Sequence, residues 1–337
     1  MNNERITVLG GGSWGTALAV LLGGKGNPVI LWDRDHELTS AMAERRVNPK
    51  YLPDTPLPDT VTPSSNLKEA AGDADWVIVA VSSEGIRTVV SEMASYIQPR
   101  TAVISACKGL EAETGFTTSE IIENLLSDVT YSGLAVISGP NLAVELIHGI
   151  PSASVVASYD PAIARAAQDL LMTDRAFRVY THNDVKGVEL GGALKNVLAI
   201  GAGISDGLGF GDNTKAALMT RGLMEMTQLG VASGGKALTF LGLSGVGDLM
   251  ATMASRLSRN YRVGLGLAQR KPIEEILKDL HQAAEGVPTA LAARVLSHRY
   301  GIATPVLSTI DDVIHNGKSP SVAVEELMGR GPRDEFV

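Results

Sequence analysis

The sequence contains one cysteine in 337 residues, Cys107. A single cysteine excludes an intrachain disulfide and a cysteine-based metal cage, and the lack of disulfides is typical of cytoplasmic proteins. We expect Cys107 to be a small buried residue at the end of a strand. The six histidines show no metal-ligand spacing. No metal site is therefore predicted.

The chain also lacks an excess of positive charge and a long apolar run. Its formal net charge is −8, whereas a general nucleic-acid-binding surface needs clustered Lys and Arg. An anionic small substrate is still allowed, because local groups bind such a ligand. We expect no signal segment, because the sequence opens without a charged-then-apolar stretch, and no apolar run of the ~18 residues of a membrane helix is expected. We expect a cytoplasmic protein with a small-molecule partner, no nucleic acid and no membrane insertion.

The strongest positive signal is a glycine-rich turn near the N-terminus. Gly10, Gly12 and Gly15 form G-x-G-x-x-G between an apolar run at 6–9 and a helix-like run at 17–22. In a strand-to-helix turn, such glycines let the backbone approach a pyrophosphate closely, and the first helical amides point at it. This context predicts a dinucleotide site.

A second feature agrees with a dinucleotide site, and one motif competes with it. The next apolar run, 29–32, ends at Asp33, about 20 positions past the glycines, where an acidic residue binds a ribose hydroxyl. The same turn also matches G-x-S-x-G, the nucleophile elbow of hydrolases. That elbow follows several core strands, and no Asp-then-His order can be assigned downstream. A hydrolase is therefore the weaker interpretation.

The pattern of apolar runs changes along the chain and predicts the fold class. Short apolar runs alternate with helix-like segments in the first half, which is typical of a parallel sheet covered on both faces. A proline-rich segment at 53–63 is expected to be a loop. Beyond residue 181, long helix-compatible runs appear without clear strands. We predict an α/β protein: an N-terminal Rossmann-type doubly wound parallel sheet in residues 1–182, followed by an all-α domain in residues 183–337.

Two turns of the first domain follow predicted strands, at the sheet edge where ligands bind in this fold. Lys108 lies after the run at 102–106 and is either a ligand-facing cation or an ordinary loop lysine. The segment 138–141 is a strand-to-helix turn with proline at a first helical position. It either binds an anion or only caps the helix.

Lys195 is the most unusual residue of the second half. It is the only charged residue between Leu190 and Ile204. A lysine removed from water releases its proton more readily and can act as an acid or base. Alternatively, its stem lies along apolar surface while its ammonium reaches water. The pattern alone does not decide between the two, and Asn196 is a possible polar partner.

Two further segments of the second half carry polar groups in apolar surroundings. Asp248 lies among glycines and apolar residues, and it either pairs with a lysine or caps the next helix. Ser258, Arg259 and Asn260 place a hydroxyl, a guanidinium and an amide side by side. Arginine suits bidentate phosphate binding. A solvated surface turn is the alternative.

Taken in order, these segments resemble the bacterial NAD(P)-dependent glycerol-3-phosphate dehydrogenases. The resemblance runs over nearly the whole chain and implies a Rossmann domain, a helical domain and a homodimer. It also implies reversible hydride transfer between NAD(P)H and dihydroxyacetone phosphate, giving sn-glycerol 3-phosphate for phospholipid synthesis. The matching segments are Gly-x-Gly-Ser-Trp-Gly-Thr-Ala, Lys108-Gly-Leu-Glu, Val136-Ile-Ser-Gly-Pro, Gly187-Val-Glu-Leu-Gly-Gly-Ala-Leu-Lys195-Asn-Val, residues 201–211 and Ser258-Arg-Asn.

The resemblance also implies roles for single residues. Lys195 is implied as the acid/base, Asp248 as the group that holds its position or protonation, and Lys108 as a contact to substrate and nicotinamide. The implied substrate-binding residues are Lys108, Gly139, Asn141, Lys195, Asp248, Ser258, Arg259 and Asn260. The implied dinucleotide-binding residues are Gly10, Gly12, Ser13, Trp14, Gly15, Asp33, Arg34, Lys108, Ala143, Arg259, Ala283 and Glu285.

The choice between NADH and NADPH stays open, although we favour NADPH with dual use. Asp33 suits a ribose hydroxyl and repels a 2′-phosphate, whereas the neighbouring Arg34 attracts one. Two other functions also stay open. One is a related hydroxyacid or sugar-nucleotide dehydrogenase, although Cys107 is poorly placed for the catalytic cysteine that the second type often needs. The other is a regulator that binds NAD(P) without turnover and does not need Lys195.

Overall fold

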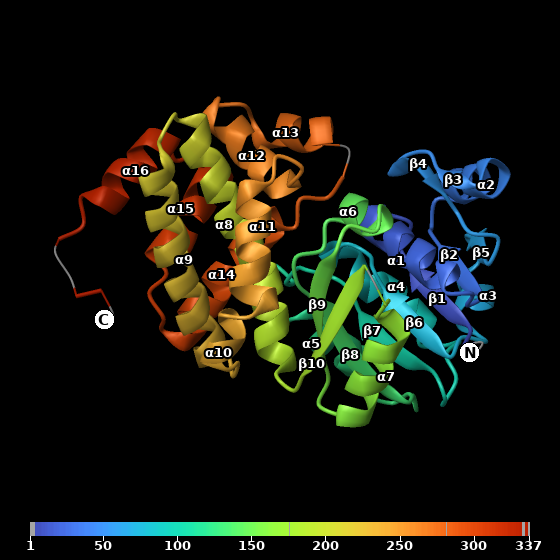
Figure 1. Ribbon diagram of the computed structural model, residues 1–337. Helices are drawn as coiled ribbons and strands as arrows, with labels where there is room; N and C mark the ends of the chain where they lie inside the picture. Colours follow the sequence, from blue (N-terminus) through green and yellow to red (C-terminus); the bar gives the residue numbers. More distant parts are fainter. Residues whose placement is uncertain (1–3, 175, 281, 332–333, 336–337) are drawn as a thin grey trace. The chain divides into compact units, whose positions relative to one another are not determined.

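The computed structural model describes residues 4–174, 176–280, 282–331 and 334–335. It divides into two compact units. The first comprises the residues up to Lys108 together with Phe116–Glu189, and the second comprises Gly109–Gly115 together with the residues from Leu190 onward. In Figure 1, blue to green marks most of the first unit and yellow to red most of the second.

The first unit is built on one eight-stranded sheet in the order β10-β9-β8-β7-β6-β1-β2-β5 (Figure 1). Six neighbouring strands of this sheet, in the order β8-β7-β6-β1-β2-β5, follow the usual order of a doubly wound dinucleotide-binding sheet. Neighbouring strands are parallel except for β8 and β9, which pair antiparallel. The strands are β1 (Ile6–Leu9), β2 (Val29–Trp32), β5 (Val61–Ser64), β6 (Trp76–Val79), β7 (Ala102–Ser105), β8 (Gly133–Ser138), β9 (Ser152–Ala157) and β10 (Phe177–His182).

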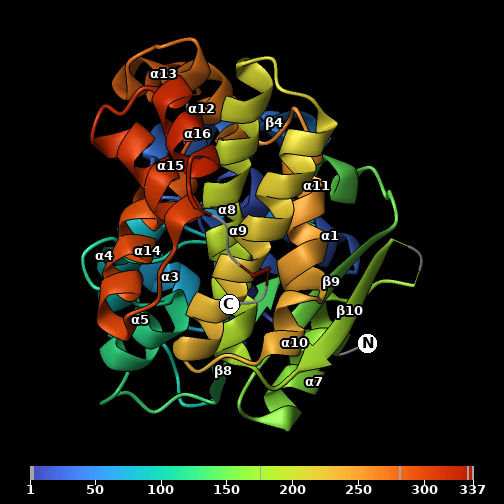
Figure 2. The same ribbon diagram turned by 90° about the vertical axis from the view of Figure 1, so that its left-hand side faces the viewer.

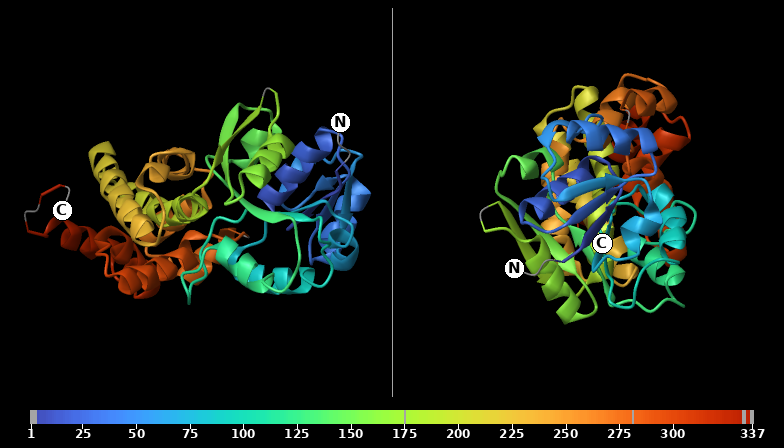
Figure 3. Two further views of the ribbon diagram at one scale, coloured as in Figure 1. Left: turned by 90° about the horizontal axis from the view of Figure 1, so that it is seen from below. Right: turned by 90° about the vertical axis from the view of Figure 1, so that its right-hand side faces the viewer.

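The central strands are apolar throughout because both faces of this sheet are covered. In β1, Val8 belongs to one buried apolar cluster, and its neighbour Leu9 belongs to another. Successive side chains of a strand point to opposite faces, so each face has its own core, and Figure 3 shows helices on both sides of the sheet. The helical segments of this unit are α1 (Ser13–Gly24), α2 (His36–Arg45), α3 (Leu67–Ala71), η1 (Ser83–Gly85), α4 (Ile86–Met93), α5 (Thr118–Leu125), α6 (Ala143–Ile147) and α7 (Pro161–Leu171).

The proline-rich segment differs from the expected loop. It contributes to a short antiparallel hairpin, β3 (Val47–Asn48) with β4 (Leu52–Pro56), and then to β5 of the main sheet. Pro63 lies within β5, which is an edge strand of that sheet. An edge strand tolerates proline because one side of its backbone has no partner strand.

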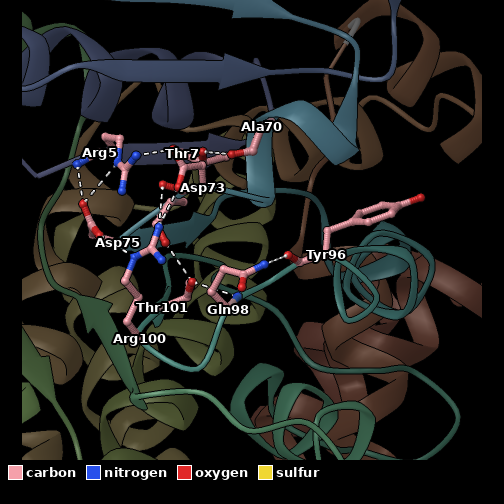
Figure 4. Close-up of polar contacts among 10 residues, drawn as sticks. Arg5, Thr7, Ala70, Asp73, Asp75, Tyr96, Gln98, Arg100 and Thr101 are labelled. Carbon is pink, nitrogen blue, oxygen red and sulfur yellow. Dashed lines mark hydrogen bonds and ion pairs between the residues drawn. The ribbon is translucent and has the colours of Figure 1, made fainter.

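Four charged side chains tie together the strands β1, β6 and β7 just before each begins (Figure 4). Arg100 donates to Asp75 at 3.0 Å and to Asp73 at 2.6 Å, and Arg5 pairs with the same two carboxylates. All four side chains are partly exposed, so the pairs add little stability individually. They lie at the amino ends of the strands, whereas ligands of this fold bind beyond the carboxyl ends.

The second unit is helical, and the part that the structure describes contains no strand. Its first helix, α8 (Val185–Gly207), begins in the first unit and is buried on all sides from Leu190 to Ser205. A helix of this kind forms the centre of a core, and the other helices pack around it (Figure 2). They are α9 (Asp212–Ala232), α10 (Ala237–Phe240), the π-helix η2 (Leu243–Gly247), α11 (Asp248–Ala254), α12 (Arg259–Ala268), α13 (Ile273–Leu280), α14 (Gly286–Tyr300), α15 (Pro305–His315) and α16 (Pro320–Met328).

One stretch of this unit, Ala237–Ala254, has the length and mean hydropathy of a membrane-spanning helix. This finding differs from the expectation that no such run exists. The stretch is not one continuous helix, because α10 ends at Phe240 and a π-helix intervenes before α11 begins at Asp248. It therefore lacks the uninterrupted hydrogen bonding that a lipid-exposed span requires.

Candidate functional site

The glycine-rich turn after β1 has two glycines that pack and one that leaves space. Gly10 has a φ of +115°, and a Cβ there would lie 2.6 Å from the carbonyl oxygen of Ala80. A Cβ on Gly15 would lie 1.9 Å from the Gly10 oxygen. A Cβ on Gly12, in contrast, would meet no atom within 4 Å. Of these three glycines, Gly12 is the one that borders space free of described protein atoms, as close approach by a pyrophosphate requires.

Helix α1 begins at this turn without a capping side chain. Gly12 is the N-cap, and the first turn, which contains Ser13 and Trp14, holds no acidic residue. With neither a capping side chain nor an acidic first turn among the described residues, the positive end of the helix dipole favours an anion. Trp14 Nε1 is buried and has no hydrogen-bond partner in the described part of the chain. These features fit the phosphate end of a dinucleotide.

Asp33 lies directly after β2, where the ribose-binding carboxylate was expected. One of its carboxylate oxygens accepts the Gly11 amide at 2.7 Å, and the other accepts the Asp35 amide at 3.0 Å. These bonds fix the carboxylate against the glycine turn. Arg34 beside it is exposed. The carboxylate of Asp33 and the guanidinium of Arg34 are therefore both present after β2. The structure of this segment alone does not choose between a ribose hydroxyl and a 2′-phosphate.

Lys108 lies beyond the end of β7 and connects to the turn that follows the adjacent strand β8. Its ammonium donates to the Gly139 carbonyl at 2.6 Å. Gly139 has a φ of +139°, and a Cβ there would crowd Ser154 at 3.0 Å. Lys108 and Gly139, which were expected near the ligand, are thus neighbours within the first unit.

Two polar groups near this turn are buried without partners in the described residues. They are the Nδ2 atom of Asn141 and the hydroxyl of Ser138. The other amide atom of Asn141, Oδ1, accepts from the Ser154 hydroxyl. Buried polar groups are nearly always hydrogen-bonded in folded proteins, so orphaned groups here fit a polar ligand that supplies the missing bonds. Ala143 begins helix α6 a few residues later.

In the second unit, Lys195 is buried and paired with a carboxylate. Its ammonium donates to Asp248 Oδ1 at 2.9 Å and to the hydroxyl of Thr252 at 2.6 Å. The Thr252 hydroxyl also donates to Asp248 at 3.1 Å, which closes a triangle of three buried groups. A buried lysine keeps its charge most easily beside a carboxylate. Of its two expected roles, Asp248 has the pairing with a lysine; it is the first residue of α11 and does not cap that helix, whose N-cap is Gly247.

Close backbone packing explains how residues so distant in sequence meet. A Cβ on Gly191 of α8 would lie 2.8 Å from the Ser244 carbonyl of the π-helix, just before Asp248. The same helix approaches α12 closely, since a Cβ on Gly203 would lie 2.0 Å from the Tyr261 carbonyl. Small residues on α8 therefore let α11 and α12 approach the helix that carries Lys195.

The segment 258–260 forms the start of α12. The Ser258 hydroxyl accepts the Tyr261 amide at 3.2 Å as a helix cap. Arg259 is partly exposed and donates to the Ala283 carbonyl at 2.6 Å. These contacts place Arg259 beside the segment that leads to Glu285, the N-cap of α14.

Asn260 is buried, and its amide connects three helices. Its Nδ2 donates to Asn196 Oδ1 at 2.9 Å, and its Oδ1 accepts the Gly286 amide at 2.9 Å. Asn196 lies on α8 next to Lys195, and Gly286 is the first residue of α14. The side chain that was expected to bind phosphate thus links the middle of α8 to the start of α14.

Sequence reasoning did not single out Thr252, the third member of the buried triangle. It lies four positions after Asp248 on one helix, and this spacing places two side chains on the same face. That signal was present but is common to many residue pairs. In the described part of the chain, no group of three or more His, Cys, Asp or Glu residues is arranged to hold a metal ion.

Comparison with known proteins shows which family this chain belongs to. Residues 5–164 match the NAD-dependent glycerol-3-phosphate dehydrogenase N-terminus, and residues 184–325 match the corresponding C-terminus. The chain is 45% identical over 332 residues to a glycerol-3-phosphate dehydrogenase [NAD(P)+] of Desulfitobacterium hafniense, covering 98% of this chain and 93% of that one. A relative of the same name from Anaeromyxobacter dehalogenans is also 45% identical, covering 98% and 100%.

Solved structures agree with these sequence comparisons. The crystal structure of glycerol-3-phosphate dehydrogenase from Coxiella burnetii superposes with a TM-score of 0.93 at 37% identity, covering 97% of this chain and 99% of that one. The structure from Dunaliella salina has a TM-score of 0.87 at 26% identity, covering 96% of this chain and 60% of that one. The chain is therefore an oxidoreductase that uses NAD(P), and it belongs to the family of NAD(P)-dependent glycerol-3-phosphate dehydrogenases.

Proposed function

We propose that this enzyme reduces dihydroxyacetone phosphate to sn-glycerol 3-phosphate with Lys195 as the acid/base, and that the product enters phospholipid synthesis. The observation that carries the proposal is the buried triangle of Lys195, Asp248 and Thr252. A proton donor in a water-poor site that is held by two hydrogen bonds is suited to general acid catalysis. The family of the chain supplies the substrate pair.

Lys195 moves the proton in this reaction. NAD(P)H held at the glycine turn would supply the hydride for the C2 carbonyl carbon, and the π electron pair of that carbonyl would then move onto its oxygen. The ammonium of Lys195 donates a proton to that oxygen, and the resulting amine regains a proton from water. Asp248 holds the ammonium 2.9 Å away and stabilises its charged form before transfer. Thr252 fixes the direction of the Lys195 side chain.

Lys108, Gly139 and Asn141 are proposed to bind the substrate, and Lys108 also the nicotinamide. The ammonium of Lys108 supplies positive charge near the oxygen on which negative charge develops. Its contact with the Gly139 carbonyl and the orphaned Nδ2 of Asn141 support this assignment. Ser258, Arg259 and Asn260 are proposed to bind the substrate phosphate, which the start of a helix and a guanidinium both favour.

The dinucleotide is proposed to bind the glycine turn through the backbone of Gly10, Gly12 and Gly15 and through Ser13 and Trp14. Open space at Gly12 and the uncapped start of α1 support this assignment. The remaining proposed dinucleotide contacts are Asp33, Arg34, Lys108, Ala143, Arg259, Ala283 and Glu285.

Exposure of Arg34 supports use of NADPH, because its guanidinium is accessible to a 2′-phosphate. Asp33 is held by two backbone amides, which partly satisfies its charge. We therefore propose NADPH as the preferred cofactor, with NADH also accepted.

Three further assignments complete the proposal. Residues 1–182 are the dinucleotide-binding domain, and residues 183–337 are the helical substrate-binding domain. The enzyme is a cytoplasmic homodimer. The two family-model matches support this division, because one ends at residue 164 and the other begins at residue 184.

The test is oxidation of NADPH and NADH, followed by absorbance, in the presence of dihydroxyacetone phosphate. We compare wild type with Lys195→Ala and, as a matched control on the same helix, Lys186→Ala. Lys186 pairs with Glu120 at 2.5 Å outside the Lys195 triangle. We expect Lys195→Ala to lose about a thousandfold in kcat, within the range of general acid catalysis, and Lys186→Ala to retain activity.

The results separate the alternatives. Wild type that binds NAD(P)H but oxidises neither cofactor with dihydroxyacetone phosphate overturns the substrate assignment. Turnover that survives in Lys195→Ala overturns the acid/base assignment while leaving the reaction in place. Sedimentation of the purified protein tests the homodimer.

A further inference from the structure

Asn48, which no sequence motif singled out, lies beneath the glycine turn and makes a dense set of hydrogen bonds. Its side chain is fully buried. Its Nδ2 donates to the Gly11 carbonyl at 2.7 Å and to the Thr16 hydroxyl at 2.8 Å. Its Oδ1 accepts the amides of Lys50 at 3.3 Å and Tyr51 at 3.2 Å. The donor of the Asn48 side-chain amide therefore bonds to the turn and to α1, and its acceptor bonds to the β3–β4 hairpin.

The bond to Gly11 determines the direction of a neighbouring amide. The peptide between Gly11 and Gly12 is planar, and in a trans peptide the C=O and the N–H point in opposite directions. Because Asn48 holds the Gly11 oxygen, the Gly12 N–H points away from Asn48. Gly12 is also the position of the turn where added volume would meet no atom within 4 Å. The amide is thus aimed from a position that borders open space.

The N–H of Gly11 is held as well as its carbonyl. The Gly11 amide donates to Asp33 at 2.7 Å, and the Thr16 hydroxyl adds a weaker bond to the Gly11 carbonyl at 3.3 Å. Side chains from β3, from α1 and from the residue after β2 therefore fix one residue of the turn at both its N–H and its C=O. Preorganised amides bind an anion more strongly than amides that must first be ordered.

We propose that Asn48 is a positioning residue for the cofactor, which holds the Gly11 carbonyl so that the Gly12 N–H is directed at the dinucleotide pyrophosphate. This inference rests on the proposed binding of the dinucleotide at the glycine turn. Asn48 does not touch the cofactor itself. It acts through the peptide that it orients, and its effect is on cofactor affinity rather than on the hydride step.

Two substitutions separate the contact to the turn from the contact to the hairpin. Asn48→Asp keeps an oxygen that accepts the Lys50 and Tyr51 amides but replaces the donor with an oxygen that repels the Gly11 carbonyl. Asn48→Leu has a similar size, adds no charge and removes all four bonds. The matched control is Asn66→Asp, because Asn66 also uses its Oδ1 to accept a backbone amide, that of Glu69 at 3.2 Å.

The experiment measures binding of NADPH, NADH and ADP-ribose by calorimetry, together with steady-state kinetics and the melting temperature. We expect both Asn48 variants to bind all three ligands about tenfold more weakly, and Asn66→Asp to bind them like wild type. At saturating cofactor, we expect kcat and the KM for dihydroxyacetone phosphate to stay within about twofold of wild type, because the hydride step is untouched. A purely structural role would lower the melting temperature without this split.

The outcomes have distinct meanings. Wild type that fails to bind ADP-ribose overturns the proposed cofactor site and the inference with it. Folded Asn48 variants that bind ADP-ribose as wild type does overturn the inference alone. If the Asn48 variants do not fold, Thr16→Val and Thr16→Ser decide, because only serine keeps a hydroxyl donor to Gly11. Equal affinities of these two variants for ADP-ribose would then overturn the inference.

Discussion

The glycine turn of the first unit and the lysine triangle of the second are built in opposite ways. The turn consists mostly of backbone from one short stretch, 10–16, and its important property is the absence of side chains. The triangle consists of side chains from two helices, and Lys195 and Asp248 are 53 positions apart. A site made of local backbone can be recognised from a motif, whereas a site made of distant side chains depends on helix packing.

The two regions also handle charge differently. In the described residues, the start of α1 has no capping side chain and no acidic residue in its first turn, so its helix dipole favours an incoming anion. The triangle compensates its own charge internally, with ammonium and carboxylate 2.9 Å apart in a buried position. Substitutions in the turn should therefore act mainly on binding, and substitutions in the triangle mainly on the chemical step. The following predictions test that contrast.

The largest effect is expected from Asp248→Asn. The change leaves the ammonium of Lys195 buried without its carboxylate, which disfavours the charged form that donates the proton. We expect kcat to fall at least a hundredfold while the cofactor KM changes little, measured by NADPH oxidation. The control is Asp312→Asn, which removes a carboxylate paired with Lys318 and Arg294 in the same unit. An Asp248→Asn enzyme with wild-type kcat would refute the role of the pair.

The second effect contrasts two glycines of the same turn. Gly12 has an extended backbone that alanine adopts without strain, and a Cβ there meets no protein atom. We expect Gly12→Ala to keep the wild-type melting temperature but to raise the cofactor KM about tenfold, because the methyl group fills the space for the pyrophosphate. Gly10→Ala should instead lose folded protein, since its Cβ would lie 2.6 Å from a backbone oxygen at positive φ. Unchanged cofactor affinity in Gly12→Ala would contradict this assignment.

A third, smaller effect is expected at Thr252. Valine has nearly the same shape but lacks the hydroxyl that lies 2.6 Å from the Lys195 ammonium. Losing one hydrogen bond to a charged group costs about 1.5 kcal/mol, so kcat of Thr252→Val should fall about tenfold. Thr252→Ser should recover most of the activity because it keeps the hydroxyl. If valine and serine gave the same kcat, the hydroxyl would have no part in positioning Lys195.

The fourth prediction concerns cofactor preference. Removing the exposed guanidinium in Arg34→Ala should raise the KM for NADPH about fivefold and leave the KM for NADH nearly unchanged, because only NADPH carries the 2′-phosphate. Arg45→Ala, another exposed arginine on the following helix α2, serves as the control. Equal losses with both cofactors would show that Arg34 does not recognise the 2′-phosphate.

The smallest effect on activity is expected at Glu225, which tests the helical core of the second unit. Glu225 is buried and accepts the amides of Val306 at 2.8 Å and Leu307 at 3.0 Å at the start of α15. Burial raises the pKa of its carboxyl to about 7. The folded state therefore holds the Glu225 proton more tightly than the unfolded state does. The contribution of this proton to the free energy of unfolding is complete below about pH 4.5 and is lost as the pH rises towards 7.

Glu225→Gln removes this titration. We expect the difference in unfolding free energy between wild type and variant to change by up to about 3 kcal/mol between pH 4.5 and 7, with wild type losing stability relative to the variant as the pH rises. Denaturant unfolding at several pH values measures this difference. A difference that stays constant over this range would show that Glu225 does not titrate there. Turnover at a fixed pH should be close to wild type.

Several features could be predicted from local patterns alone. The glycine turn needs only short-range geometry, and the apolar runs that became β1, β6 and β7 have the period and length of buried strands. The order of the predicted segments along the chain also indicated the family, which the comparisons confirmed. Segments whose structure depends on distant partners were predicted less well. The edge strand β5 contains Pro63 and lies in the segment that was expected to be a loop.

The sequence by itself determined the elements and the residue types that chemistry requires: a glycine-rich turn, an isolated lysine in an apolar helix and an aspartate among glycines. Only the tertiary structure decided which of these groups meet. Lys195 has two possible environments in the sequence, and the close approach of α8 to the π-helix selects the one with Asp248 and Thr252. Asn48 acquires its role in the same way, because a hydrogen bond between residues 37 positions apart depends on packing and not on any local pattern.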